Sequence, residues 1–210
     1  MRLNRLEFAL MNNPLRAAIQ RYYEAPRLLH MGGSMAGGRA LEMGCGRGVG
    51  AELILDLFKA DRVDAFDLDE RMVARARRRL QRRGPRAHVW VGDATAIPVA
   101  ADTYDAVFDF GIIHHIPEWR RALHEVRRVL KPGGRLYAEE VLAAFINNPV
   151  VKKLLEHPRV DRFDAAAFEA GLKEAGLLHQ HTRRLAGAMA WFTATRGASG
   201  PTGTEADEAQ

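Results

Sequence analysis

The sequence of 210 residues contains a single cysteine, Cys45, and no long apolar stretch. One cysteine excludes an internal disulfide and any metal site built on paired cysteines. No segment approaches the roughly 20 consecutive apolar residues of a membrane-spanning helix, and the first residues lack the apolar core of a secretory signal. No His, Asp or Glu cluster has the spacing of metal ligands. These absences favour a cytoplasmic protein that has no transmembrane segment and binds no metal.

The composition is that of an ordinary globular domain, with 47% apolar and 27% charged residues and a formal net charge of +5. Much of the positive excess lies in six arginines between residues 75 and 83, interleaved with apolar residues at helical spacing. No aromatic residue interleaves with them, so a solvated helix face is favoured over a nucleic-acid surface. Arg16, Arg21 and Arg27 leave open an acidic substrate or a peripheral membrane contact. The sequence does not indicate an oligomeric state.

Strand-like and helix-like segments alternate along the chain, which predicts a doubly wound α/β fold. The patterns predict strands at 39–43, 62–66, 87–91, 104–108, 134–139, 178–185 and 189–196, and helices at 14–29, 49–59, 70–83, 117–130, 145–156 and 165–175. We therefore expect a helical N-terminal segment over residues 1–38, one catalytic domain over 39–196 and a disordered tail over 197–210.

A glycine-dense turn follows the first predicted strand. Glu42 precedes glycines at 44, 46, 48 and 50, and a helical pattern begins directly after them. Glycines tolerate positive φ and let a ligand lie against bare backbone at a helix N-terminus. The dinucleotide fingerprint requires a glycine or alanine where this chain has Val49, which counts against a nicotinamide-dependent oxidoreductase. An acidic residue before G-x-G-x-G resembles motif I of the class I S-adenosylmethionine-dependent methyltransferases.

Two further carboxylates follow the next two predicted strands. Asp67 lies about 20 residues beyond the glycine turn, where a carboxylate that binds both ribose hydroxyls is expected; we assign the capping of the next helix to Asp69. Asp93 ends the third predicted strand and can accept a hydrogen bond from an adenine amine, while the small Ala94 leaves room for a ring.

A longer block strengthens the resemblance. Tyr104-Asp105 opens a strand that leads to Ile113-His114-His115, and a helix with Glu125-Val126-Arg127 then runs into Lys131-Pro132-Gly133-Gly134. Over residues 39–140 the chain closely resembles the methyltransferase type 11 group. This resemblance implies a Rossmann-like, seven-stranded sheet whose last strand is antiparallel, with a helical N-terminal lid and S-adenosylmethionine as cofactor. The cofactor-binding positions that it implies are Glu42, Gly44, Cys45, Gly46, Gly48, Asp67, Leu68, Asp93, Ala94 and Phe110.

The expected reaction is in-line displacement of the sulfonium methyl group, which needs alignment more than acid–base chemistry. His114 or His115 is a candidate base, although the same pair can simply pack the turn. Asp109 and Glu139 at strand ends, and Tyr22 and Tyr23 in the lid, are candidate substrate contacts.

Residues 110–113 lack the Asn/Asp-Pro-Pro-aromatic turn of base and glutamine N-methyltransferases, so a small-molecule acceptor is favoured. The apolar residues of the lid and of the segment after residue 140 suit a lipophilic or aromatic one. The alternative is a non-catalytic protein of the same fold that binds S-adenosylmethionine as a sensor or scaffold.

Overall fold

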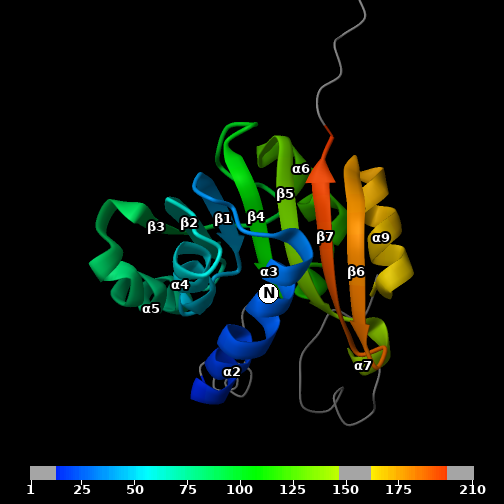
Figure 1. The fold of residues 1–210 in the computed structure, drawn as a ribbon, viewed down its shortest axis with the longest axis horizontal. Helices are drawn as coiled ribbons and strands as arrows, with labels where there is room; N and C mark the ends of the chain where they lie inside the picture. Colours follow the sequence, from blue (N-terminus) through cyan, green and yellow to red (C-terminus); the bar gives the residue numbers. More distant parts are fainter. Residues whose placement is uncertain (1–12, 147–161, 198–210) are drawn as a thin grey trace, which may run out of the picture.

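A computed structural model describes residues 13–146 and 162–197 (Figure 1). The helical elements are α2 (Pro14–Ile19), the π-helical η1 (Gln20–Glu24), α3 (Ala25–Gly32), α4 (Val49–Asp56), α5 (Glu70–Leu80), the 3₁₀ segments η2 (Gln81–Arg86) and η3 (Ile113–His115), α6 (Trp119–Val129), α7 (Ala143–Ile146) and α9 (Ala165–Glu174). The strands are β1 (Arg39–Met43), β2 (Arg62–Asp67), β3 (Ala87–Val91), β4 (Tyr104–Phe110), β5 (Leu130–Val141), β6 (Leu177–Leu185) and β7 (Met189–Arg196).

These strands form one seven-stranded sheet in the order β3-β2-β1-β4-β5-β7-β6. The first five strands in this order pair in parallel, whereas β7 pairs antiparallel with both β5 and β6. The order reverses between β1 and β4, which is the point where open α/β sheets bind ligands at the carboxyl ends of their strands. The predicted doubly wound sheet with an antiparallel last strand is confirmed.

Helices cover both faces of the sheet (Figure 1). On one face α3, α4 and α5 enclose a core that includes Leu28, Ile54, Phe58 and Trp191. On the other face α6 and α9 pack on the sheet through residues such as Trp119 and Phe168. The buried positions of α6 (Trp119, Ala122, Leu123, Val126 and Val129) recur every three or four residues. That spacing places them on one helical face and explains why this segment folds as a covering helix.

Some boundaries differ from the sequence prediction. The predicted helix 117–130 begins at Trp119, and β5 already begins at Leu130, where Lys-Pro-Gly-Gly predicts a turn. Gly133 has φ +77° and the register of β4 with β5 shifts between Tyr104 and Ala106, so the turn is absorbed into the start of the strand. Most of the predicted helix 145–156 and nearly all of the predicted disordered tail 197–210 lie outside the described residues.

The N-terminal segment is helical from Pro14 to Gly32, in line with the predicted helix 14–29. Asn13 caps it, since its side chain accepts a hydrogen bond from the Leu15 amide at 2.8 Å. The far end is fixed to the sheet because the Tyr137 hydroxyl on β5 donates to the Gly33 carbonyl at 2.8 Å. Among the described residues, no helix is long and apolar enough to cross a membrane.

Candidate active site

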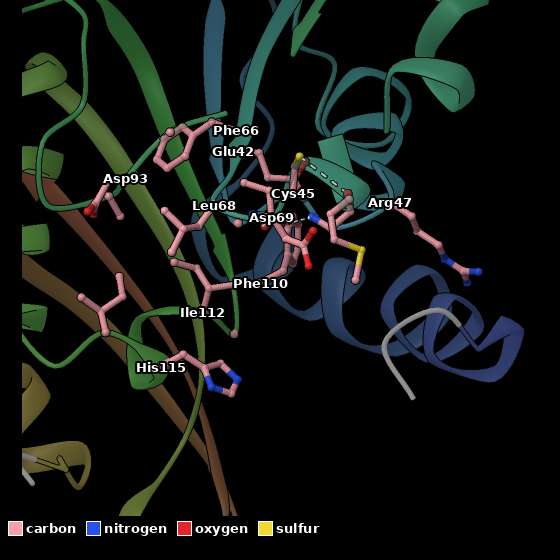
Figure 2. Close-up of a pocket in the computed structure, with 18 of the residues that line it drawn as sticks. Glu42, Cys45, Arg47, Phe66, Leu68, Asp69, Asp93, Phe110, Ile112 and His115 are labelled. Atoms are coloured by element: carbon pink, nitrogen blue, oxygen red, sulfur yellow. Dashed lines mark hydrogen bonds between the residues drawn. The ribbon is translucent and has the colours of Figure 1, made fainter. Parts of the chain in front are cut away.

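A cavity of about 280 Å³ opens at the carboxyl ends of β1, β2, β3 and β4. The turns after these four strands line it, together with one side of α2 and η1. Figure 2 shows that Phe66, Leu68 and Asp93 gather on one side of the site and that Arg47 extends from the other. Segments far apart in the sequence therefore meet at this one edge of the sheet.

The glycine turn after β1 forms the floor of the cavity. Gly44, Gly46 and Gly48 all have positive φ, at +62°, +50° and +82°, which residues with a Cβ adopt only under strain. The Cys45 amide donates to the Phe66 carbonyl of β2 at 2.9 Å, so the turn is fastened to the neighbouring strand. A Cβ on Gly46 would meet no atom within 4 Å, because this residue faces the open cavity. Gly48 caps α4 and is the one predicted cofactor position that does not line the cavity.

Replacing Gly44 by alanine is expected to destabilise the fold by about 3 kcal/mol, measured as the free energy of unfolding in urea. The new Cβ would lie 2.4 Å from Cγ2 of Ile112 and would also need the positive φ. Gly46→Ala is the matched control. It carries the same backbone strain without the clash, so its loss is expected to be only about 1 kcal/mol. Equal losses in the two variants would contradict the packing argument.

Glu42 lies at the centre of the site with only 2% of its surface exposed. One side of its carboxylate accepts a hydrogen bond from the Ala51 amide in the first turn of α4. The other oxygen, Oε2, has no hydrogen-bond partner among the residues that the structure describes. Burial raises the pKa of Glu42 well above its ordinary value, and the nearby carboxylates of Asp67 and Asp109 raise it further. A buried acceptor of this kind fits a cationic donor such as an ammonium group.

Asp67 connects the end of β2 to the glycine turn. Its Oδ2 accepts from the Gly46 amide and its Oδ1 accepts from the Asp69 amide, both at 2.9 Å. Burial raises the pKa of this carboxyl, although the two amides oppose the shift. Asp69 caps α5 by accepting from the Arg71 amide at 2.9 Å, so the capping role predicted for it is confirmed. The fixed carboxylate of Asp67 keeps lone pairs for a ligand that lies over the turn.

An apolar slot next to Asp67 ends at Asp93. Phe66, Leu68, Met72 and Ala94 line it, and Leu68 is 44% exposed although it is a large apolar side chain. The Oδ1 atom of Asp93 accepts from the amide and the hydroxyl of Thr95, at 2.8 and 2.9 Å. An apolar lining that ends in a carboxylate suits a flat ring with a polar edge.

The two histidines that follow β4 have different surroundings. His115 lines the cavity, and Figure 2 shows Phe110 and Ile112 between it and Glu42. His114 does not line the cavity: its Nδ1 lies 2.5 Å from Oε2 of the fully buried Glu140. Burial raises the pKa of Glu140 to about 7, and Asp109, which shares a hydrogen bond with it, has a pKa raised well above its ordinary value by burial and by Glu140. His114, Glu140 and Asp109 therefore form a buried polar cluster behind the turn.

The four residues predicted to contact substrate do not line the cavity. Asp109 belongs to the buried cluster, and Glu139 accepts from the Trp191 indole nitrogen at 2.9 Å. Tyr22 points into solvent with 78% of its surface exposed, and Tyr23 packs edge-on against Trp191. None of these four side chains can contact a molecule in the cavity in the present arrangement. Their roles in substrate binding stay predictions.

Comparison with known proteins identifies the domain. A family model described as a methyltransferase domain matches residues 40–134. A Mycolicibacterium smegmatis protein named "probable S-adenosylmethionine-dependent methyltransferase" is 39% identical over 99 residues, which cover 47% of this chain and 36% of that protein. The phthiotriol/phenolphthiotriol dimycocerosates methyltransferase of Mycobacterium tuberculosis is 31% identical over 123 residues, or 59% of this chain and 43% of that protein. Residues 40–134 thus match a methyltransferase domain, and this part of the chain is similar to S-adenosylmethionine-dependent methyltransferases. The chain spans well under half the length of these two curated relatives.

Solved structures share the fold of this methyltransferase domain at low identity. A Haloferax volcanii methyltransferase in complex with the activator Trm112 superposes with a TM-score of 0.76 at 17% identity, covering 91% of this chain and 98% of that one. A SAM-dependent methyltransferase of Aquifex aeolicus gives 0.72 at 18% identity, covering 93% and 100%. The fold therefore extends beyond the segment 40–134 that the family model matches.

The methyltransferase site fits the cofactor that its family implies, S-adenosylmethionine. The unpaired oxygen of Glu42 fits the ammonium group, the fixed carboxylate of Asp67 fits two ribose hydroxyls and the apolar slot fits the adenine ring. No group of three or more His, Cys, Asp and Glu residues within 13–146 and 162–197 is arranged to hold a metal ion.

The structure adds residues that the motifs did not single out for the cofactor. Arg16, Ala17 and Gln20 from the N-terminal helix line the methyltransferase cavity, as do Arg47 and Ile112. Arg16 contacts Glu24 and lies 3.6 Å from Glu139, so two buried carboxylates hold its guanidinium at the cavity edge. Only the apolar spacing of 14–29 signalled this helix, and spacing alone does not show which side faces a ligand.

Proposed function

We propose that the protein transfers a methyl group from S-adenosylmethionine to a lipophilic small-molecule acceptor. The observation that carries this proposal is a single cavity with two unlike ends. The turns after β1, β2 and β3 line one end with carboxylates and bare glycine backbone. The turn after β4 lines the other end mainly with apolar groups, namely Phe110, Ile112, Ile116 and Pro117. A charged cofactor and an apolar acceptor suit these two ends respectively.

In this proposal the chain acts mainly by positioning. Glu42 holds the ammonium group, Asp67 holds the ribose and the slot ending at Asp93 holds the adenine. When bound, S-adenosylmethionine would supply an electrophilic methyl group, and its sulfur would keep the electron pair of the S–C bond that breaks. The largely apolar wall at Ile112 and Ile116 disfavours water along the line of attack.

Two lines of support favour a lipophilic acceptor. The turn after β4 offers His115 and Glu118 among otherwise apolar side chains, so it has few partners for a strongly polar molecule. In addition, the M. tuberculosis relative is named for methylation of phthiotriol dimycocerosates. Since that relative is matched over 43% of its length, its name supports a class of acceptor and not a particular molecule.

His115 is the residue that we propose as base for an acceptor hydroxyl. Its ring lies against that of His114, with centroids 4.2 Å apart and the ring planes tilted by 38°, and His114 is anchored by Glu140. A hydroxyl that attacks the methyl group would pass its proton to the imidazole of His115, which leaves a neutral ether product. We expect His115→Asn to lower kcat by roughly tenfold, less than a typical general base contributes, because the sulfonium methyl is already a strong electrophile.

The test is transfer of labelled methyl from S-adenosylmethionine into a lipid extract and, separately, into a water-soluble extract. Label in the lipid extract, reduced in His115→Asn at neutral pH but recovering at high pH, supports the proposal. Label in the water-soluble extract only would overturn the acceptor class. Tight binding of S-adenosylhomocysteine by calorimetry without transfer into either extract would favour the alternative of a cofactor-binding sensor.

A further inference from the structure

The outward face of the N-terminal helical segment is apolar. Leu15, Ile19 and Tyr22 are 64%, 41% and 78% exposed. They are spaced four and three residues apart, so they lie on one helical face, which we call the exposed stripe. On the other side of the same turns Gln20 and Glu24 are buried, and α3, which continues the segment, enters the core through Ala25 and Leu28. A helix that packs on a protein core normally presents polar residues to solvent, and this one presents three large apolar groups.

Positive charge borders the exposed stripe on the side of α4 and α5. Arg47 donates to the Asn13 carbonyl at the start of α2, at 2.8 Å. Arg21 and Arg79 share the carboxylate of Glu52, at 3.5 and 2.9 Å, so two cations meet one anion. The pKa of Arg47 is lowered by burial and by the neighbouring charges of Arg79 and Arg75, which reflects a positive local potential.

A second basic region borders the stripe on the side of the antiparallel strands. A groove between α3 and β6 is lined by Arg27, His30, Met31 and the residues 180–184, and the described part of the chain places no carboxylate in its lining. Arg27 is held there by stacking on the rings of Tyr23 and Trp191, at 4.5 and 4.6 Å. The exposed stripe is thus an apolar strip between two cationic borders.

The stripe also lies at the mouth of the active site. Arg16, Ala17 and Gln20 line the cavity from the same helical segment. Figure 1 shows α2 at the end of the molecule toward which the parallel strands run, and α7, which carries the 43% exposed Phe145, lies at this end too. A surface pressed against this end would adjoin the entrance to the cavity.

We propose that the exposed stripe docks on an anionic lipid bilayer, from which a lipophilic acceptor enters the cavity. Apolar side chains that insert at the headgroup boundary, with arginines beside them, are the chemistry of interfacial helices. The two cationic borders match an anionic surface and disfavour contact between two copies of this positively charged face. The acceptor part of this inference rests on the proposed function, whereas the docking itself is measured separately.

The experiment is co-sedimentation of the full chain with vesicles of phosphatidylcholine alone and of phosphatidylcholine with phosphatidylglycerol. We expect binding to the anionic vesicles, weakened by high salt. The triple variant Leu15→Gln, Ile19→Gln, Tyr22→Ser is expected to lose at least about tenfold in vesicle affinity. Leu178→Gln is the matched control, since Leu178 is 57% exposed but lies at the start of β6, at the opposite end of the sheet, and it should bind as the wild type does.

Calorimetry with S-adenosylhomocysteine on the same samples separates the two proposals. Unchanged cofactor binding with lost vesicle binding in the triple variant supports docking through the stripe. Absence of binding to anionic vesicles by the wild type, or equal binding by the triple variant, overturns docking and leaves the proposed function standing. If the triple variant fails to fold, the single variant Tyr22→Ser tests the docking, and its affinity for anionic vesicles is expected to fall by about threefold. A dimer that the substitutions dissociate, without effect on vesicles, would assign the stripe to self-association instead.

Discussion

Asp67→Ala is expected to raise the dissociation constant of S-adenosylhomocysteine by about 1,000-fold. Two hydrogen bonds from ribose hydroxyls to a charged carboxylate contribute roughly 1.5–3 kcal/mol each, which corresponds to this range. The same substitution removes the acceptor of the Gly46 and Asp69 amides, so the glycine turn loses one of its links to β2 and keeps the one from the Cys45 amide to the Phe66 carbonyl. We therefore expect a thermal midpoint several degrees lower even without the cofactor. Calorimetric titration and thermal unfolding measure the two effects.

Asp67→Asn separates charge from shape. The amide oxygen still accepts one hydrogen bond, so the turn is expected to stay largely intact and the affinity to fall by only about 30-fold. Asp93→Ala is the comparison at the other end of the slot, where the carboxylate is exposed and already bonded to Thr95. Its expected loss is about tenfold. Wild-type affinity in Asp67→Ala would contradict the ribose role and remove the main support for the cofactor geometry.

The features that could be predicted from the sequence are local ones. The turn from Glu42 to Gly48 depends on backbone angles that only a few residues accept, and the alternation of strands and helices depends on nearest-neighbour spacing. The order of the parallel strands then brings Asp67 and Asp93 to the same edge as the turn. These residues line one cavity, as the resemblance implied, because the carboxyl ends of parallel strands all lie at the same edge of the sheet.

The roles that could not be predicted depend on which side of a strand or turn faces the cavity and which side faces the core. Glu139 and Glu140 are neighbours at the end of β5, and strand alternation sends them to opposite faces. The structure buries both, one against Trp191 and one against His114, and neither lines the cavity. His114 and His115 are likewise adjacent in the sequence, but only His115 reaches the cavity. The orientation of each of these side chains is determined by contacts with residues that are distant in the sequence.

Arg16 illustrates the same limit for the N-terminal segment. The apolar pattern of 14–29 predicts a helix, but it does not predict the π-helical turn at Gln20–Glu24. Each hydrogen bond of a π-helix spans one residue more than in an α-helix. This wider turn places Glu24 on the buried side of the segment, where it contacts Arg16 beside Glu139. An isolated arginine on a helix gives no sequence signal for this. Pairing of buried carboxylates with one guanidinium appears only when the helix is docked on β5 and β7.

Glu42→Gln is expected to raise the dissociation constant of S-adenosylhomocysteine by about 100-fold at neutral pH. The amide keeps the size of the side chain but cannot form a charge-assisted hydrogen bond with the ligand's ammonium group in this buried position. Wild-type affinity should also fall as the pH falls below the pKa of Glu42, because the protonated carboxyl no longer attracts a cation. The pKa is raised by burial and by Asp67 and Asp109, so this loss begins well above the ordinary value of 4.5. In Glu42→Gln this pH dependence should disappear.

Binding in the wild type must then release a proton wherever Glu42 is protonated in the free protein. Titrations in buffers of different ionisation enthalpy measure that release, and Glu42→Gln should show none of it. The stability of the folded protein depends on pH in the opposite direction from the affinity for the ligand. Because the folded pKa is raised, the folded protein holds more protons than the unfolded chain, and its stability falls as the pH rises through the folded pKa. Without cofactor, Glu42→Gln should therefore unfold at a higher temperature than the wild type at alkaline pH. A variant that binds as weakly but unfolds earlier would show that Glu42 holds the turn together and does not serve the ligand.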